Sequence, residues 1–268
     1  MKFIYHCSQF NKMILVCRNL LLFVLTLSLS IGCSDKVRIQ KTETKEYAFS
    51  KDGNSGIDSL VEKRIQPYRD KMSGEMNTVL AESVQPLEKN TPESRLGNFV
   101  ADVCLMQCNQ RMQSNGGSVA DFLILNNGGL RKGLPKGNIT KGDVYELMPF
   151  ENELVVLTMT GVNVKKIFNF IASKDGAPVS GVRFQIQDKQ AVNISIQGVA
   201  FDSTRTYTVA TSDYLANGGD QFSMLADPIR RESSGLKVRD AIMQYLYIQG
   251  KTEEKIVVNP DGRISHVK

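Results

Sequence analysis

The spacing of apolar residues changes several times along the chain, and each change predicts a new element. Apolar residues three and four positions apart predict helices, whereas alternating or continuous apolar runs of four to eight residues predict strands. The helical spacing occurs in residues 57–65, 96–112, 162–172 and 236–249. The strand pattern occurs in residues 76–83, 119–125, 153–160, 182–187, 191–197 and 207–211. Helices and strands are mixed without strict alternation, which predicts a mixed α+β or layered α/β domain.

Some of these segments predict more than their type. Residues 119–125 are almost continuously apolar, as is typical of a strand covered on both faces. Residues 182–187 and 191–197 are separated by three polar residues, which predicts a hairpin. Pro67 predicts that the first helix either stops there or continues a little further with a kink.

The first 32 residues have the pattern of an export signal. Basic residues are followed by the apolar run of residues 20–31, which is too short to remain as a membrane span. Gly32 precedes Cys33, which resembles a bacterial lipoprotein cleavage site, although Ser30 stands where such sites normally have leucine. We therefore expect Cys33 to become the lipid-modified first residue, with plain secretion or a retained anchor as the alternatives.

The domain organisation and location follow from this pattern. Residues 33–56 are polar and rich in Lys, Glu, Asp and Ser, which predicts a tether, and residues 57–268 form the predicted folded domain. The sequence thus predicts a protein held by its lipid in the bacterial cell envelope, on the periplasmic or surface side of the outer membrane.

The charge balance argues against a nucleic-acid polymer as the partner. The 33 basic residues become 30 when the export segment is removed, against 28 acidic residues. A net charge near +2 gives no basic surface of the kind that attracts DNA or RNA.

Residue types that catalyse reactions or bind metals are scarce. Cys104 and Cys108 lie four positions apart on a predicted helix, where they share a face but are poorly placed for a disulfide, so we expect two small buried residues. The two histidines are His6, in the export segment, and His266, near the end of the chain. With so few histidines, the domain cannot form a catalytic triad or a dinuclear metal centre. We therefore assign no catalytic residue, no metal ligand and no cofactor. Carboxylate catalysis is the weakest alternative, and its candidates are Asp143, Glu146, Glu151 and Glu153.

Three short motifs have the composition of ligand loops. The first is LNNGGLR at residues 125–131, the second is MPFEN at residues 148–152, and the third is YLANGGD at residues 214–220. Gly and Asn tolerate the positive φ angles that tight turns require. Loops of this kind, with aromatic and charged residues beside the turns, predict a site for a flat, polar molecule.

These motifs, in this order and spacing, resemble the C-terminal, substrate-binding domain of the 5′-nucleotidase family. Further matching blocks are Glu93 with Leu96, Gly97 and Asn98, and Ile139-Thr140 with Asp143-Val144. The resemblance extends from about residue 76 to about residue 225. It implies a layered α/β/β/α fold.

The resemblance also implies a role for each loop residue. Phe150 and Tyr214 match the two aromatic positions that sandwich a nucleobase, where tyrosine replaces the more usual phenylalanine; the alternative is that both rings belong to the core. Asp220 matches the carboxylate that binds the ribose hydroxyls, or else it caps a turn. Asn126 and Asn152 match amides near the base, although Asn126 could equally form an Asx turn.

The remaining positions concern the phosphate and the loop backbone. Arg131 matches an arginine that faces the substrate's phosphate, and the alternative is a surface arginine paired with a carboxylate. The glycines that shape the two turns are Gly128, Gly129, Gly218 and Gly219. Asn127 stands where the family more often has another glycine.

Active members of the family also carry an N-terminal metallophosphatase domain, which the sequence lacks the histidines to form. Three functions therefore compete. In the first, the chain is the nucleotide-recognition part of a 5′-nucleotidase in nucleotide catabolism and works with a separate metallophosphatase chain, which would hold the divalent metal ions. In the second, it is a surface lipoprotein that binds nucleosides or nucleotides without hydrolysis. In the third, it is a degenerate domain kept for protein contacts.

Overall fold

The computed structural model describes residues 59–267. The predicted export segment, Cys33 and the tether lie outside the described residues, so these predictions are not tested. Within the described residues, no helix is both long and apolar enough to cross a membrane.

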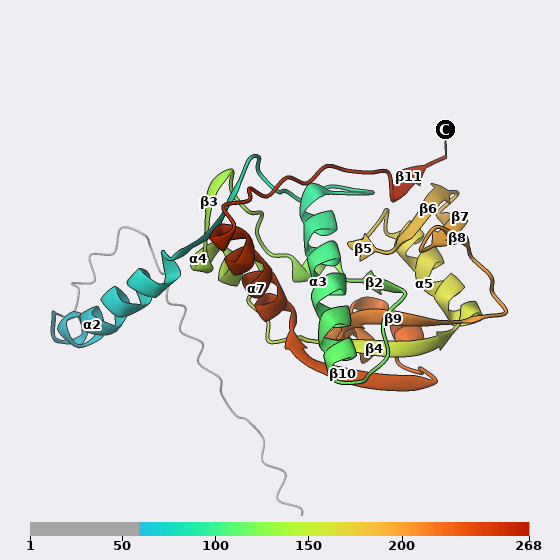
Figure 1. Ribbon diagram of the computed structural model, residues 1–268, viewed down its shortest axis with the longest axis horizontal. Helices are drawn as coiled ribbons and strands as arrows, with labels where there is room; N and C mark the ends of the chain where they lie inside the picture. Colours follow the sequence, from blue (N-terminus) through green and yellow to red (C-terminus); the bar gives the residue numbers. More distant parts are fainter. Residues whose placement is uncertain (1–58, 268) are drawn as a thin grey trace, which may run out of the picture. The chain divides into compact units, whose positions relative to one another are not determined.

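The described chain contains helices and strands in mixed order (Figure 1). The helices are α2 (Ser59–Met76), α3 (Arg95–Ser114), η1 (Asn127–Gly129), α4 (Lys141–Leu147), α5 (Gly161–Ser173), α6 (Asp213–Ala216), η2 (Gly219–Gln221), η3 (Ser223–Leu225) and α7 (Val238–Lys251). The strands are β1 (Val79–Ser83), β2 (Phe122–Ile124), β3 (Gly137–Thr140), β4 (Glu153–Thr160), β5 (Val179–Ser180), β6 (Val182–Gln187), β7 (Gln190–Ile196), β8 (Val199–Ala200), β9 (Thr206–Ser212), β10 (Arg230–Lys237) and β11 (Ile264–His266). The mixed α/β class that the sequence predicts is confirmed.

A five-stranded sheet in the order β10-β4-β9-β2-β5 forms the centre of the fold. Its strands β2 and β9 are parallel, and the other neighbours are antiparallel. A four-stranded sheet has the order β11-β6-β7-β8, and β1 pairs with β3 in a third, small sheet. The sheet is therefore mixed, with its longest antiparallel pairing between β4 and β9.

Both faces of the five-stranded sheet are covered. Leu154 and Val156 of β4 lie in a core with α3 and α7, whereas Val155 and Leu157 lie in a second core with α5, β6 and β7. Alternate residues of a strand point to opposite faces, so a strand buried on both sides has a continuous apolar run. The same alternation holds in β2, so the prediction of a strand covered on both faces is confirmed for Phe122–Ile124, whereas Val119 is exposed and lies outside the strand.

Most predicted elements are found at the predicted places, including α3, β4, α5, the β6-β7 hairpin and β9. Several segments differ, and the short elements β3, α4, β5, β8 and β11 are not among the predicted ones. Helix α2 continues through Pro67 to Met76 and buries no side chain, so the strand predicted from residue 76 begins only at Val79. Strand β10 was not predicted, because its sequence RRESSGLK is polar and it pairs with a neighbour only on its β4 side. Leu236 therefore belongs to β10 and not to the final helix, which begins at Val238.

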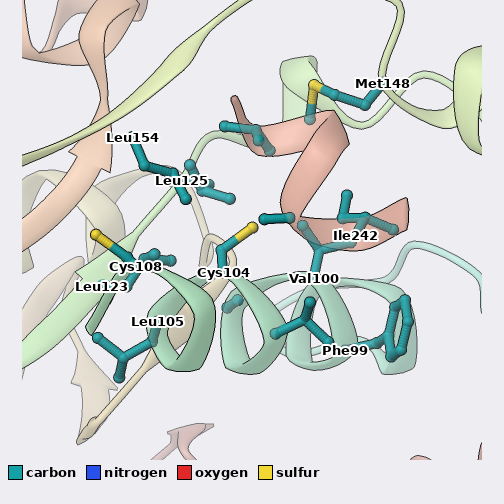
Figure 2. Close-up of a cluster of buried hydrophobic side chains, with 14 of the residues drawn as sticks. Phe99, Val100, Cys104, Leu105, Cys108, Leu123, Leu125, Met148, Leu154 and Ile242 are labelled. Atoms are coloured by element: carbon teal, nitrogen blue, oxygen red, sulfur yellow. The ribbon is translucent and has the colours of Figure 1, made fainter. Parts of the chain in front are cut away.

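Figure 2 shows Cys104 and Cys108 within the core that α3 shares with the central sheet and α7. Both thiols are free and fully buried. Burial raises the pKa of Cys104, and it raises the pKa of Cys108 to about 11. Their burial confirms the interpretation as two small core residues. The raised pKa keeps both thiols protonated at neutral pH, and a protonated thiol is not a nucleophile.

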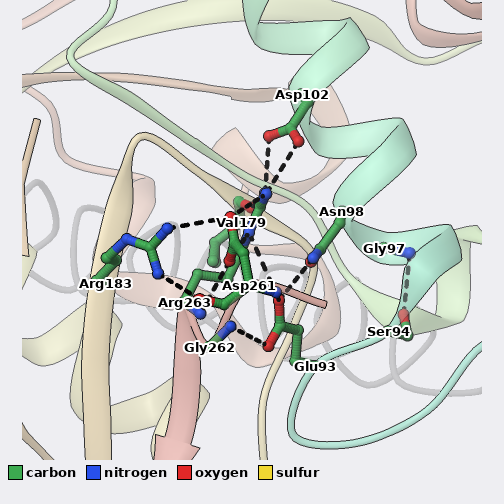
Figure 3. Close-up of polar contacts among 10 residues, drawn as sticks. All are labelled: Glu93, Ser94, Gly97, Asn98, Asp102, Val179, Arg183, Asp261, Gly262 and Arg263. Atoms are coloured by element: carbon green, nitrogen blue, oxygen red, sulfur yellow. Dashed lines mark hydrogen bonds and ion pairs between the residues drawn. The ribbon is translucent and has the colours of Figure 1, made fainter. Parts of the chain in front are cut away.

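Arg263 connects the C-terminal segment to the rest of the domain through hydrogen bonds (Figure 3). Its guanidinium donates to both carboxylate oxygens of Asp102 at 2.7 and 2.9 Å, to Asp261 at 3.0 Å and to the carbonyl of Val179 at 2.8 Å. Burial alone would lower the pKa of Arg263, but the hydrogen bonds and charges of Asp102 and Asp261 raise it. Arg263 thus joins α3, β5 and the segment that leads into β11.

Glu93 has a structural role at the same place. Its carboxylate accepts hydrogen bonds from the side chain of Asn98 at 2.6 Å and from the backbone N–H groups of Asp261 and Gly262 at 2.8 and 2.9 Å (Figure 3). The family-like block that begins at Glu93 therefore holds the C-terminal turn against the start of α3.

Candidate functional site

The three candidate loops meet at one edge of the central sheet because of the strand directions. Strands β2 and β9 are parallel, so the loops that follow them leave the sheet on the same side. Strand β4 is antiparallel to β9, with Leu154 opposite Ser212, so the loop that precedes β4 lies on that side too. The backbone N–H of Glu153 donates to Asp213 Oδ1 at 3.2 Å and ties two of these loops together.

A pocket of about 310 Å³ lies between the three loops. All six predicted side chains and two of the four predicted glycines line it: Asn126, Gly128, Gly129, Arg131, Phe150, Asn152, Tyr214 and Asp220. Residues that are up to 94 positions apart in the sequence thus surround a single space. The volume is of the size used for small-molecule sites.

The other two glycines shape the third loop without lining the pocket. Gly218 has a φ of +87°, which glycine adopts without strain. A Cβ on Gly219 would lie 2.5 Å from Cζ of Tyr214, so only glycine allows that ring to lie against the turn. Both glycines are required by the backbone that presents Tyr214 and Asp220.

Phe150 and Tyr214 present their rings to solvent and do not belong to the core. Phe150 is 39% exposed and Tyr214 is 45% exposed. Large aromatic side chains that remain exposed inside a pocket are available for stacking on a flat ring. The interpretation of the two rings as core residues is wrong.

Tyr214 also holds Asp220 in position. The Tyr214 hydroxyl donates to Asp220 Oδ1 at 3.0 Å and accepts from the backbone N–H of Asp220 at 3.2 Å. Asn126 donates through Nδ2 to the other oxygen, Oδ2. Each carboxylate oxygen keeps a further lone pair, so Asp220 can still accept two hydrogen bonds from a ligand.

Arg131 and Asn152 complete the pocket. The Arg131 side chain is exposed and donates to the carbonyl of Gly128 at 3.4 Å, and in the described part of the chain it forms no ion pair with a carboxylate. The predicted alternative of a surface arginine paired with a carboxylate is therefore not found there. Asn152 is half-buried, and its carbonyl accepts from the backbone N–H of Val238 at 2.9 Å.

No pattern in the sequence identifies Arg239, which supports the Phe150 loop through its backbone carbonyls. Arg239 is buried and donates to the carbonyls of Met148 at 3.4 Å and Phe150 at 3.3 Å. It also forms an ion pair with Glu151, and its guanidinium lies 4.5 Å from the centre of the Tyr145 ring. A single arginine near the start of a predicted amphipathic helix gives no local signal of such a role.

Glu151 is the acidic residue that pairs with Arg239 and helps to hold the Phe150 loop. Hydrogen bonds from Lys237 and then Arg239 lower its pKa to about 2, although burial acts in the opposite direction. A carboxyl whose pKa is lowered in the folded state contributes its full stability above its unfolded pKa, and this contribution is lost as the pH falls through the folded pKa. The Phe150 loop therefore keeps this ion pair at any pH above about 4.

Replacing Arg239 by methionine should weaken adenosine binding about tenfold, although Arg239 does not line the pocket. Methionine fills much of the volume but leaves the two loop carbonyls without their donor, and such losses weigh about 1–3 kcal/mol. Calorimetric titration of the purified full chain measures the change. As a control, Lys237→Met removes only an exposed partner of Glu151 and should change the affinity less than twofold. Equal adenosine affinities in Arg239→Met and the wild type would show that Arg239 does not hold the Phe150 loop in its binding position.

The fold and the pocket together define a class of protein. A mixed α/β domain with an open, polar and partly aromatic pocket at one edge of its sheet is a small-molecule recognition domain. The model of the 5′-nucleotidase C-terminal domain matches residues 74–227, which is more than half of the chain, and the chain belongs to this family.

Individual relatives agree with this assignment. A trifunctional nucleotide phosphoesterase of Bacillus subtilis is 31% identical over 193 residues, which is 66% of this chain and 13% of the relative. A 5′-nucleotidase of Vibrio parahaemolyticus is 24% identical over 248 residues, which is 88% of this chain and 40% of the relative. The crystal structure of a 5′-nucleotidase precursor from Thermus thermophilus superposes with a TM-score of 0.65 and 27% identity, covering 78% of this chain and 43% of that chain. The chain thus spans less than half the length of these relatives.

Proposed function

We propose that the domain binds nucleosides and nucleoside 5′-phosphates in the pocket at the edge of the central sheet. The base stacks between Phe150 and Tyr214, the ribose hydroxyls donate to Asp220, and the phosphate meets Arg131. The observation that supports this proposal is the single pocket lined by all six side chains. Stacking tolerates any base, because every base has a flat face.

The amides provide the remaining polar contacts in this proposal. Asn126 uses its Nδ2 group on Asp220 and keeps its carbonyl oxygen for a donor on the ligand. Asn152 offers both a donor and an acceptor to the edge of the base. Arg131 suits a phosphate because its planar guanidinium can bind two oxygens in parallel.

Hydrolysis in this proposal is the work of a separate metallophosphatase chain. The described residues contain no cluster of three His, Cys, Asp or Glu side chains that fits a metal ion, so we assign no metal-dependent step to them. His266 is paired with Asp175, with 3.0 Å between Nε2 and Oδ1, and neither residue lines the pocket. The divalent metal ions would belong to the partner, and the two chains together would form a 5′-nucleotidase of nucleotide catabolism.

The location forms part of the proposal. Cys33, at the end of an export-type segment, would carry the lipid that holds the protein in the bacterial cell envelope. This arrangement would place the pocket where exported enzymes meet nucleotides outside the cytoplasm. No polymer of nucleic acid is needed as a partner.

The purified full chain should release no phosphate from AMP in the presence of Mn²⁺ or Zn²⁺. Addition of a metallophosphatase chain that lacks its own C-terminal domain should start the release, and a phosphate assay measures both. Turnover by the chain alone, surviving purification to homogeneity, would overturn the division of labour. An inert mixture that still binds AMP would instead favour the second candidate, a lipoprotein that binds nucleotides without hydrolysis.

A further inference from the structure

A second pocket of about 340 Å³ adjoins the nucleoside pocket, and we refer to it as the side pocket. It is lined by the first and third loops and by the end of α5. The two pockets share Asn126, Gly128 and Asp220. The hydrogen bond between Asn126 and Asp220 therefore forms part of the wall between them.

The position of this wall decides which part of a ligand reaches the side pocket. This step rests on the proposed function, in which the ribose hydroxyls face Asp220. Arg131, Phe150 and Tyr214 line the nucleoside pocket but not the side pocket, so the base and the 5′-phosphate stay outside it. Only a group attached to the 2′ or 3′ oxygen of the ribose lies next to the shared wall, and the hydroxyl that carries no such group still donates to Asp220.

The side pocket has an apolar floor and a polar rim. Phe170 and Phe222 meet edge to face, with 4.7 Å between the ring centres, and Phe222 is buried. Lys174, the residue that follows α5, places its Nζ 5.4 Å from the centre of the Phe170 ring and 3.4 Å from Gln221 Oε1. The Phe170 ring and the Gln221 side-chain amide thus hold the ammonium group of Lys174 at the side pocket.

Hydrogen-bond donors gather around this cation. Asn127 donates one amide hydrogen to the carbonyl of Gly176 at 3.2 Å and keeps a second one. Gln221 accepts from Lys174 through its oxygen and keeps its NH2 group as a donor. Asp220 is the acidic residue of the lining, and both of its oxygens already accept hydrogen bonds from Tyr214 and Asn126. One ammonium and two amides suit a tetrahedral anion such as a phosphoryl group.

The backbone of the third loop presents two consecutive side chains to the pockets. Asp220 and Gln221 have φ angles of +49° and +68°, in the left-handed region. Asp220 lines both pockets and Gln221 lines the side pocket.

From this geometry we propose that the side pocket binds a phosphoryl group carried on the 2′ or 3′ oxygen of the ribose. The ligands of the domain then include nucleoside 3′-phosphates and nucleoside 3′,5′-bisphosphates. The 5′-phosphate and the 3′-phosphate meet different cations, Arg131 and Lys174.

Titration of the full chain with adenosine, 3′-AMP and 5′-AMP tests this assignment. The wild type should bind 3′-AMP about tenfold more tightly than adenosine, as expected for hydrogen bonds to a charged group. Lys174→Gln should remove this advantage and keep the advantage of 5′-AMP. Lys166→Gln is the matched control. Lys166 lies on α5, the helix that ends just before Lys174, donates to Asn163 and does not line the side pocket, so the affinities of this variant should equal those of the wild type.

Two results would overturn the side-pocket assignment but not the proposed function. In the first, the wild type binds 3′-AMP no more tightly than adenosine. In the second, Lys174→Gln still binds 3′-AMP more tightly than adenosine to the same degree as the wild type. A wild type that does not bind adenosine would overturn the proposed function, and the side-pocket assignment with it. Thermal unfolding of each variant separates these results from misfolding, because Lys174 is exposed and its replacement should leave the melting temperature within about 2 °C of the wild type.

Discussion

Replacing Phe150 or Tyr214 by alanine should weaken adenosine binding by about 1–3 kcal/mol, or roughly 5- to 150-fold in Kd. Each ring is exposed within the pocket, so its removal costs the stacking energy and leaves the core intact. Tyr214→Ala also removes the two hydrogen bonds to Asp220. Calorimetric titration of the purified full chain with adenosine measures the effect.

Two controls sharpen this prediction. Tyr214→Phe keeps the ring but removes the two hydrogen bonds to Asp220, so it should retain the stacking and lose part of the preference for ribose over 2′,3′-dideoxyribose. Tyr247→Ala removes an exposed ring on α7, outside the pocket, and should leave adenosine binding unchanged. Unchanged affinity in both Phe150→Ala and Tyr214→Ala would place the ligand elsewhere.

Replacing Arg263 by methionine should reduce the free energy of unfolding by about 2–4 kcal/mol, measured by urea denaturation. Removal of one partner from a buried charged network costs about 3–5 kcal/mol, and the half-exposed Asp102 and Asp261 reduce that figure. Arg183→Met is the matched control, because Arg183 pairs with Asp261 at the surface and such pairs contribute at most about 1 kcal/mol. Equal losses in the two variants would contradict the role of Arg263.

The same variant should change the response to acid. Burial acts to raise the pKa of Asp261, but the hydrogen bond and charge of Arg263 outweigh it and lower that pKa. A carboxyl with a lowered folded pKa stabilises the protein above its unfolded pKa, near 3.9, and this stabilisation is lost as the pH falls through the lower folded value. Arg263→Met should therefore lose less stability than the wild type between neutral pH and pH 3. Parallel acid profiles would show that Asp261 does not depend on Arg263.

The sequence could predict the parts of the molecule whose structure follows from residues close together in the chain. The continuous apolar run of β2 follows from burial on both faces, residues 153–160 carry the alternation of a strand, and the loop residues stand beside strand ends in short motifs rich in Gly and Asn. Because the strand directions bring those ends to one edge, side chains as distant as Asn126 and Asp220 line one pocket.

The parts that the sequence could not predict depend on contacts between distant segments. Strand β10 is polar, so its pairing with β4 has no apolar signature. Arg239 and Arg263 resemble surface arginines in the sequence, and only the tertiary fold buries them. Arg263 meets Asp102 across 161 positions, a separation at which no local pattern exists. The side pocket was missed for the same reason, since Lys174 meets Gln221 only in the fold.

The most direct test of the nucleoside-binding pocket is a crystal structure of the protein with AMP. The account predicts the adenine between the rings of Phe150 and Tyr214, the ribose hydroxyls on Asp220 and the 5′-phosphate beside Arg131. AMP bound at another surface, or a ligand in this pocket whose base touches neither ring, would contradict it.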